Sequence, residues 1–178
     1  NIEIVGGNGA GNPKLAVVNF TNEDGSISDE ISSDFKITGE FNVINYASTD
    51  AVESGVQYTV SGTEEQDPST GQTKIQYKLI NNATQEVMLN QTASFNAKYI
   101  RKAVHAISNN VYQKLTNTPG DFTSKIALAV EQAPKKYAVI VADYDGYNPK
   151  TLISAAHPII SLAWDKSGQY LSYVTYET

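Results

Sequence analysis

Residues 97–115, "AKYIRKAVHAISNNVYQKL", carry the most regular apolar pattern in the chain, and it restricts the fold more than any other feature. The apolar positions recur at intervals of four, three, four and four residues: Ile100, Val104, Ile107, Val111 and Leu115. That spacing forms one stripe along an α-helix, which Asn96 is placed to cap. A helix with a single apolar stripe has to bury it against another layer. The sequence therefore predicts a helix that packs on a sheet.

Three alternating segments upstream predict that sheet. They are "VQYTVS", "TKIQYKL" and "VMLNQTASF", and their predicted core residues are Val56, Tyr58, Val60, Ile75, Tyr77, Leu79, Val87, Leu89, Ala93 and Phe95. Alternation with period two is typical of a strand that buries one face. The connections are polar, and the acidic stretch 63–67 ("TEEQD") is expected to be a solvated turn. We expect an antiparallel meander with one side facing solvent.

A strand–helix–strand unit is predicted before the meander. Residues 15–20 ("LAVVNF") form a continuous apolar run, typical of a strand buried on both faces, and residues 41–46 ("FNVINY") form a second strand. Between them Ile27, Ile31 and Phe35 recur at helical spacing. The unit is βαβ-like, so its crossover should be right-handed.

The helix of this unit has recognisable ends. Ser26 or Ser28 is a candidate N-cap, and Gly39 is a stop signal because glycine adopts the left-handed conformation that ends helices. Together these segments predict an α+β domain over residues 13–120, with a mixed sheet of about five strands and two helices. Residues 1–12 contain four glycines and are expected to form a flexible N-terminal arm.

The pattern changes after Pro119 and Gly120, which end the second helix. Residues 121–178 contain five strand-like runs with short turns and no helical periodicity. The sequence therefore predicts a second part that is entirely β.

Charge and composition exclude several classes of function. The formal net charge is −6, from 13 basic and 19 acidic residues, so neither nucleic acid nor an anionic membrane surface is an expected partner. The chain has no cysteine, which excludes disulfides and thiolate metal sites. It has no apolar run of about 18 residues, so no transmembrane helix is predicted.

Catalytic motifs are missing from the sequence. The glycine run near the N-terminus lacks the lysine of a phosphate-binding loop, and neither a Gly-x-Ser-x-Gly elbow nor a His-x-x-x-His pair occurs. His105 lies off the apolar stripe and should be half-exposed, and His157 lies in a loop before a proline. The "DYDGYN" segment has its glycine two residues too early for a calcium loop, so a hairpin turn at Asp145 and Gly146 is expected instead. We therefore expect no enzymatic activity, cofactor or metal.

Two segments in the second part resemble the repeat of TolB-type β-propellers. That repeat combines a Trp-Ser-Pro-Asp-Gly turn, a Leu-Ala-Tyr-Val strand and a strand that ends in Asp-x-Asp-Gly-x-Asn. The matching residues here are Asp143, Asp145, Gly146, Asn148, Trp164, Gly168, Leu171, Tyr173 and Val174. Asp165, Lys166 and Ser167 replace the Ser-Pro-Asp of the turn, so the usual geometry of that turn is not assumed.

The resemblance extends to the first part of the chain. The order of arm, apolar strand, helix, strand, meander ("IQYKLINN") and helix ("YIRKAVHAISNNVYQKLT") is similar to the N-terminal domain of the TolB family. The resemblance implies that residues 124–154 form three strands of one propeller blade and residues 160–176 form two strands of a second. A six-bladed propeller needs many more residues, so we expect an incomplete propeller segment, as in a fragment or a truncated chain.

The resemblance also implies a function. The family is periplasmic once its signal peptide is removed, so Asn1 would lie near the mature N-terminus. It belongs to the Tol–Pal system, which supports outer-membrane integrity and envelope constriction during cell division, and it has no known enzymatic activity or cofactor. Its N-terminal arm and domain engage TolA, its propeller engages the lipoprotein Pal, and colicins use the propeller in translocation. The arm residues implied to bind a partner, by adding a strand to its sheet, are Asn1, Ile2, Glu3, Ile4 and Val5.

Two other interpretations remain beside this one. Some serine peptidases carry similar propeller repeats ahead of a hydrolase domain, so the chain is alternatively the N-terminal fragment of such an enzyme. The strand–helix order of the first domain also loosely resembles anticodon-binding α/β folds, but a net charge of −6 argues against RNA.

Overall fold

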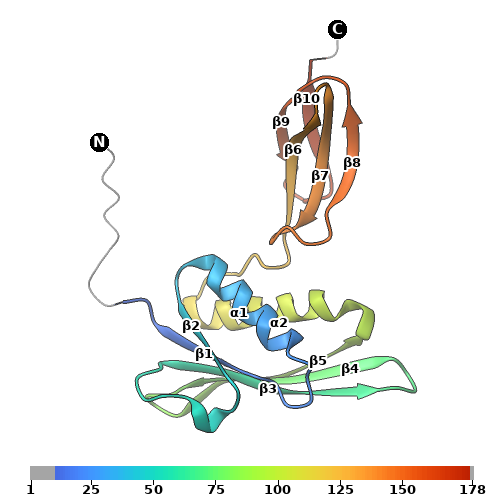
Figure 1. The fold of residues 1–178 in the computed structure, drawn as a ribbon. Helices are drawn as coiled ribbons and strands as arrows, with labels where there is room; N and C mark the ends of the chain where they lie inside the picture. The colour runs from blue at the N-terminus through green and yellow to red at the C-terminus, as the bar shows by residue number, and fades with distance from the viewer. Residues whose placement is uncertain (1–10, 177–178) are drawn as a thin grey trace. The chain divides into compact units, whose positions relative to one another are not determined.

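A computed structural model describes residues 11–176, and the chain divides into two compact units, Asn1–Gly120 and Asp121–Thr178. Each unit is described separately (Figure 1). The described elements of the first unit are β1 (Lys14–Val18), α1 (Ser26–Thr38), β2 (Asn42–Tyr46), η1 (Thr49–Ala51), β3 (Tyr58–Asp67), β4 (Gln72–Asn81), β5 (Glu86–Asn96), η2 (Ala97–Tyr99) and α2 (Ile100–Thr116).

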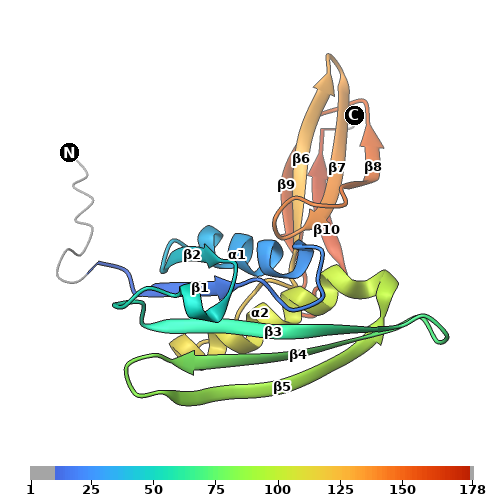
Figure 2. The same ribbon diagram turned by 60° about the horizontal axis from the view of Figure 1, so that its bottom comes forward.

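The five strands of the first unit form one mixed sheet, in the spatial order β2-β1-β3-β4-β5. β1 lies parallel to both β2 and β3. A parallel pair needs a crossover connection, and α1 forms that connection between β1 and β2. β3, β4 and β5 form an antiparallel meander. Both α-helices cover the same face of this sheet (Figures 1 and 2). The predicted α+β fold, with a mixed sheet of five strands and two helices, is confirmed.

The hydrophobic core lies between the helices and the sheet. Its buried members are Leu15, Val17, Phe20, Ile27, Ile31, Phe35, Phe41, Val60, Ile75, Tyr77, Leu79, Val104, Ile107 and Val111. From the predicted stripe of α2, Val104, Ile107 and Val111 are buried and Ile100 and Leu115 are half-buried, so that stripe is confirmed. Each fully buried large side chain contributes roughly 1.5–3 kcal/mol, so this layer is a large stabilising term for the unit.

β1 is buried on both faces, as its continuous apolar run predicts. Leu15 and Val17 belong to the core under the helices. Ala16 and Val18 point to the opposite face and are buried there as well. The central part of the sheet is therefore covered on both sides, whereas β4 shows the alternation of a strand with one solvent-facing side.

The predicted core position of Val87 is wrong. The register between β4 and β5 shifts at a β-bulge: Leu79 pairs with Leu89, but Ile80 pairs with Val87. The extra residue, Met88, reverses the alternation of the strand at this point. Val87 is consequently 52% exposed, while Leu89 packs against the core.

The acidic stretch 63–67 is not the solvated turn that its composition suggests. It belongs to β3, where Glu64 pairs with Ile75 and is buried. Gln66 Nε2 donates a hydrogen bond to Glu64 Oε1 over 2.7 Å. Backbone pairing between β3 and β4 continues through these polar residues to the turn after Asp67, because ladder hydrogen bonds do not depend on apolar side chains.

The start of α1 differs from the prediction. Gly25, rather than Ser26 or Ser28, precedes the helix, and no side chain of the cap residue closes it. The carboxylate of Glu23 instead accepts hydrogen bonds from the backbone N–H groups of Ile27 and Ser28, at 2.9 and 3.0 Å. A negative charge thus lies at the positive end of the helix dipole.

Two other predicted helix ends are confirmed. Gly39 ends α1 in the left-handed region, with a φ of 68°. The side chain of Asn96 accepts a hydrogen bond of 3.2 Å from the backbone N–H of Lys98. It caps η2, which runs directly into α2, so the helical segment begins where the sequence indicates.

The second unit is all-β in its described residues. β6 (Lys125–Ala133), β7 (Lys136–Asp143) and β8 (Lys150–Ala155) form a three-stranded antiparallel sheet, and β9 (Ile159–Trp164) and β10 (Leu171–Thr175) form a two-stranded one. Its buried apolar side chains are few: Phe122, Ala138, Val139, Ala142 and Ile159. Three strands followed by two is the arrangement expected of an incomplete propeller segment.

Gly62 of β3 allows a close approach inside the first unit, and its replacement tests the packing there. A Cβ at this position would overlap the carbonyl oxygen of Gln76 and lie 2.5 Å from the buried ring of Phe20. We expect Gly62→Ala to lower the free energy of unfolding by about 1–3 kcal/mol, the usual range for overpacking. Urea unfolding followed by circular dichroism measures this. Gly11→Ala is the control, because a Cβ there meets nothing within 4 Å; equal losses in both variants would contradict the expectation.

Candidate functional site

The predicted site residues fall in two places. The arm residues Asn1, Ile2, Glu3, Ile4 and Val5 lie outside the described residues. The predicted propeller residues lie in the second unit, at two turns and the strands beside them. A groove and a buried ionic cluster in the first unit are further candidates that the sequence did not suggest.

The first turn joins β7 to β8 and contains Asp143, Asp145, Gly146 and Asn148. The N–H of Gly146 donates to the carbonyl of Asp143 over 2.8 Å, and the N–H of Asp143 donates to the carbonyl of Tyr147 over 2.9 Å. Gly146 and Asn148 have φ values of 86° and 53°, in the left-handed region that glycine and asparagine tolerate best. Backbone geometry thus accounts for these residue types, and the chain turns at Asp145 and Gly146 as the sequence indicates.

The second turn joins β9 to β10 and repeats this hydrogen-bond pattern. The N–H of Gly168 donates to the carbonyl of Asp165 over 3.0 Å, and the N–H of Asp165 donates to the carbonyl of Tyr170 over 2.9 Å. The carboxylate of Asp165 also accepts from the Ser167 hydroxyl and from the N–H groups of Ser167, Gln169 and Tyr170. These bonds, the Ser167 hydroxyl first among them, lower the pKa of Asp165 from 3.8 to about 2. These hydrogen bonds close the turn although it lacks the proline of the family repeat.

A groove of about 580 Å³ in the second unit is lined by residues of both turns. Asn148, Trp164, Gly168 and Leu171 all line it, so the fold brings together four of the residues that match the propeller repeat. Lys125 lies on its wall and pairs with Asp143 of the first turn, with 2.7 Å between Nζ and Oδ1. The two turns therefore share one surface feature.

The second unit exposes many large apolar side chains, both on its strands and in the segments beside them. They are Leu128, Tyr147, Leu152, Ile160, Trp164, Tyr170, Tyr173, Val174 and Tyr176. Large apolar side chains gathered on one small unit often mark a surface that packs on a partner. Exposure of this kind is typical of repeat units, whose apolar faces pack on a neighbouring unit.

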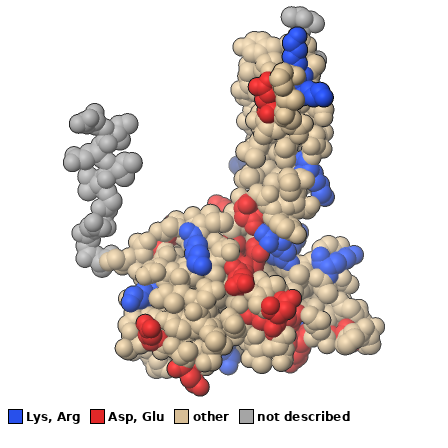
Figure 3. All heavy atoms as spheres, viewed as in Figure 1, with Lys and Arg blue, Asp and Glu red and all other residues tan. Residues whose placement is uncertain are grey.

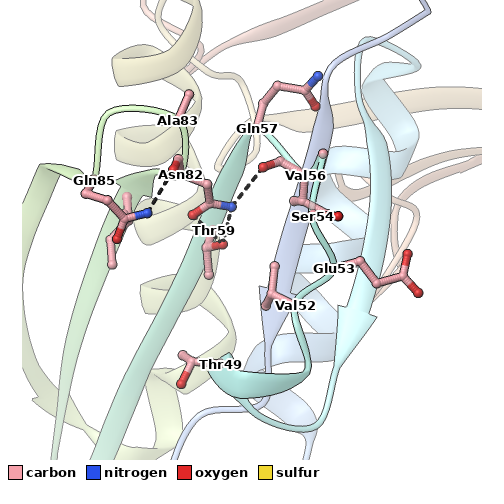
Figure 4. Close-up of a pocket in the computed structure, with 12 residues that line it drawn as sticks. Thr49, Val52, Glu53, Ser54, Val56, Gln57, Thr59, Asn82, Ala83 and Gln85 are labelled. Carbon is pink, nitrogen blue, oxygen red and sulfur yellow. Dashed lines mark hydrogen bonds between the residues drawn. The ribbon is translucent and has the colours of Figure 1, made fainter.

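The groove of the first unit has a volume of about 750 Å³ and lies between segment 49–57 and the neighbouring ends of β3 and β4 (Figure 4). Asn82 connects its two sides. The Asn82 side chain donates to the carbonyl of Val56 over 3.0 Å and to the hydroxyl of Thr59 over 2.9 Å. The N–H of Asn82 donates to the carbonyl of Gln57 over 2.8 Å. One amide side chain thus fixes the segment to the sheet.

The lining of this groove is mixed in character. Val52 and Ile80 are apolar, most other lining residues are small or uncharged, and Glu53 is the ionisable member. A single carboxylate without a base, a nucleophile or a metal-binding neighbour in the lining does not form a catalytic constellation. The groove is therefore a candidate contact surface rather than a candidate active site.

A buried ionic cluster joins α1 to α2. Glu30 and Asp34 lie one turn apart on α1, and Arg101 and His105 lie one turn apart on α2. His105 Nδ1 lies 3.0 Å from both carboxylate oxygens of Asp34, and its Nε2 lies 3.3 Å from Glu30 Oε1. Arg101 forms an ion pair with the other oxygen of Glu30. The four side chains therefore connect the two helices through charge as well as through the apolar core.

His105 is buried, at 3% exposure, so the prediction of a half-exposed histidine is wrong. The apolar stripe of α2 shows which face meets the core but not that α1 packs on the flank beside it. The i, i+4 spacing of the acidic pair and of the basic pair is visible in the sequence. That the two pairs face each other depends on helix packing, which local periodicity does not contain.

The electrostatic environment of His105 favours its protonated form. Burial by itself lowers the pKa of His105, but the hydrogen bond to Asp34 and the negative charges of Asp34 and Glu30 oppose it. These outweigh both burial and the positive charge of Arg101, so the pKa lies above the ordinary value of 6.5.

Glu30, Asp34 and His105 are also the group that could hold a metal ion within the described part of the chain. Their donor atoms lie within 4.8 Å of one another. The arrangement fits a proton better than a metal ion. Both ring nitrogens face carboxylates, and the guanidinium of Arg101 supplies positive charge beside Glu30 that would repel a cation.

Comparison with known proteins places both units in one family. The family described as "TolB beta propeller domain" matches residues 112–178. The Tol-Pal system protein TolB of Acinetobacter baylyi is 33% identical over 181 residues, which cover 93% of this chain and 42% of that protein. The crystal structure of TolB from Acinetobacter baumannii has a TM-score of 0.81 at 30% identity, and the match covers 94% of this chain and 45% of that one. The chain is a TolB homologue.

The similarity to TolB extends over both units. The TolB of Nitrosospira multiformis, for example, is 34% identical over 183 residues, 94% of this chain. The resemblance seen in the sequence is therefore confirmed, as is the expected fold of a TolB N-terminal domain followed by part of a propeller. The chain spans less than half the length of the curated TolB proteins that it matches.

Surface charge and helix length add two observations. On the face shown in Figure 3, acidic and basic side chains are scattered among each other, in keeping with a net charge of −6. Among the described residues, every helix is too short or too polar to cross a bilayer.

Replacing Asn82 tests how segment 52–57 is held. We expect Asn82→Ala to lower the free energy of unfolding by about 1–3 kcal/mol, because it leaves the carbonyl of Val56 and the hydroxyl of Thr59 without that partner. Hydrogen exchange at the amides of Val56 and Gln57 should quicken. Ser54→Ala is the matched control, since Ser54 lines the same groove but is exposed. Unchanged exchange in Asn82→Ala would show that the segment is held by other contacts.

The pKa of Asp165 can be checked by NMR titration of its carboxyl group. Its folded pKa is lowered to about 2, so the stability that it adds to the turn is present above 3.8 and is lost as the pH falls through about 2. We expect Ser167→Ala to raise the pKa of Asp165 toward 3.8, because the hydroxyl of Ser167 is the largest cause of the shift. Ser172→Ala is the control, since its hydroxyl donates to Ala163 instead. A pKa unchanged by Ser167→Ala would contradict this account.

Proposed function

We propose that the chain is a non-enzymatic, periplasmic protein-binding scaffold of the Tol–Pal system, acting in outer-membrane integrity and envelope constriction during cell division. The similarity to proteins named Tol-Pal system protein TolB over 93% of the chain carries this proposal. The propeller-containing peptidase gains no comparable support, because the similarity to TolB includes the α+β unit as well as the propeller unit.

We propose TolA as the partner of the N-terminal arm and its domain. The arm sequence "NIEIV" can add as a strand to the edge of a partner's sheet, with Ile2 and Ile4 on one side of that strand and Glu3 and Val5 on the other. The glycine-rich residues 6–12 that follow are suited to tether such a strand to β1.

We propose Pal, and colicin translocation domains, as partners of the propeller in its complete form. In this chain the motif residues of the second unit support turn geometry: Gly146 and Gly168 supply left-handed backbone, and Asp165 accepts the bonds that close its turn. They act on binding through the shape of the blades.

Calorimetric titration of the C-terminal periplasmic domain of TolA tests the proposed role of the arm. We expect the chain to bind and a chain that begins at Pro13 not to bind. Ile2→Asp combined with Ile4→Asp should remove binding, because it places two charges on the apolar side of the added strand. Glu3→Gln, on the other side, should leave the affinity within about threefold, that is, within roughly 0.7 kcal/mol.

Two outcomes would contradict the arm as the site. Equal binding by the intact chain and the chain that begins at Pro13 would move the site onto the α+β unit. Absence of binding by both, with native circular dichroism, would contradict the proposal that this part of the protein engages TolA.

A further inference from the structure

We propose that Glu30, Asp34, Arg101 and His105 form a proton-operated clamp between α1 and α2, closed when His105 is protonated and weakened when it is neutral. The clamp is a property of the α+β unit and does not depend on the Tol–Pal assignment.

Charge balance favours the closed state. With His105 protonated, two carboxylates face one guanidinium and one imidazolium, and the cluster is neutral. With His105 neutral, the same cluster carries one uncompensated negative charge. The Asp34 side chain is 0% exposed and that of His105 is 4% exposed, so water screens this charge poorly.

Hydrogen-bond geometry leads to the same state. Nδ1 of His105 faces Asp34 and Nε2 faces Glu30, at 3.0 and 3.3 Å. Carboxylates only accept hydrogen bonds, and only the imidazolium donates from both ring nitrogens. In neutral His105 one nitrogen would present a lone pair to a carboxylate. With Nδ1 donating to Asp34, the lone pair of Nε2 would face Glu30, so the attraction of that ion pair would be replaced by a repulsion.

The cluster lies next to the core residues through which α1 and α2 pack. Glu30 and Asp34 each precede a core residue of α1, Ile31 and Phe35, and His105 follows the core residue Val104 of α2. The charged groups that act on His105 are Glu30 and Asp34 from α1 and Arg101 from its own helix. The clamp therefore acts directly beside the apolar contact of the two helices.

The direction of the pH effect follows from linkage. The folded-state pKa of His105 is raised above 6.5. The stability that protonation supplies is therefore fully present below pH 6.5 and is lost as the pH rises through the folded-state pKa. Each pH unit by which that pKa exceeds 6.5 corresponds to tenfold tighter proton binding by the folded chain.

The test uses the two histidines of the intact chain as each other's control. NMR titration of the imidazole Cε1–H signals should show His105, assigned by its loss in His105→Gln, titrating above 6.5. Urea unfolding midpoints measured between pH 5.5 and 9 should fall as His105 loses its proton. The fall should disappear in His105→Gln and persist in His157→Gln.

A second variant keeps the proposal testable if His105→Gln does not fold. Asp34→Asn retains the shape of the side chain and removes its charge, so it should lower the pKa of His105 and reduce the pH dependence of the midpoint. A His105 signal that titrates at or below 6.5 in the native chain would overturn the clamp. So would saturable binding of Zn²⁺ that is lost in His105→Gln, because the cluster would then be a metal site.

Discussion

Burial of one face of the mixed sheet beneath α1 and α2 is the interaction on which the rest of the first unit depends. β1 is an interior strand of this sheet and is apolar on both faces, so it must be covered on both. The helices cover one side with the stripe of α2 and with Ile27, Ile31 and Phe35 of α1. Once both helices share that face, their flanks meet, and the polar residues on those flanks must satisfy one another.

The ionic cluster is a consequence of that packing. A buried carboxylate such as Asp34 is costly unless a positive charge and a hydrogen-bond donor accompany it, and His105 supplies both. Arg101 pairs with Glu30 in the same cluster. The cluster adds a directional, titratable contact to an otherwise apolar interface. Apolar packing tolerates small shifts of one helix along another, whereas charged hydrogen bonds hold one register.

The second unit shows the contrasting case of repeat architecture. Its two small sheets bury few side chains of their own, and its strands expose Leu152, Tyr173 and Val174 among others. Its local order instead comes from turns that repeat one pattern, in which an aspartate and a glycine three residues later close the loop. Stability in such architectures depends on contacts between successive units, so a blade is stabilised by its neighbours more than by a core of its own.

The local sequence pattern was sufficient to predict the elements whose apolar residues recur at a regular spacing and the turns that need a glycine. The stripe of α2, the double burial of β1, the stop at Gly39 and the hairpin at Gly146 follow from short-range rules of periodicity and backbone conformation. Composition wrongly predicted a turn at Glu64, where backbone pairing between β3 and β4 continues through polar residues. Alternation wrongly predicted a core position for Val87, where a β-bulge reverses the direction of the side chains. Only the tertiary structure decided that His105 lies between Asp34 and Glu30, because 71 residues separate it from Asp34 and their contact depends on which flanks of two helices meet.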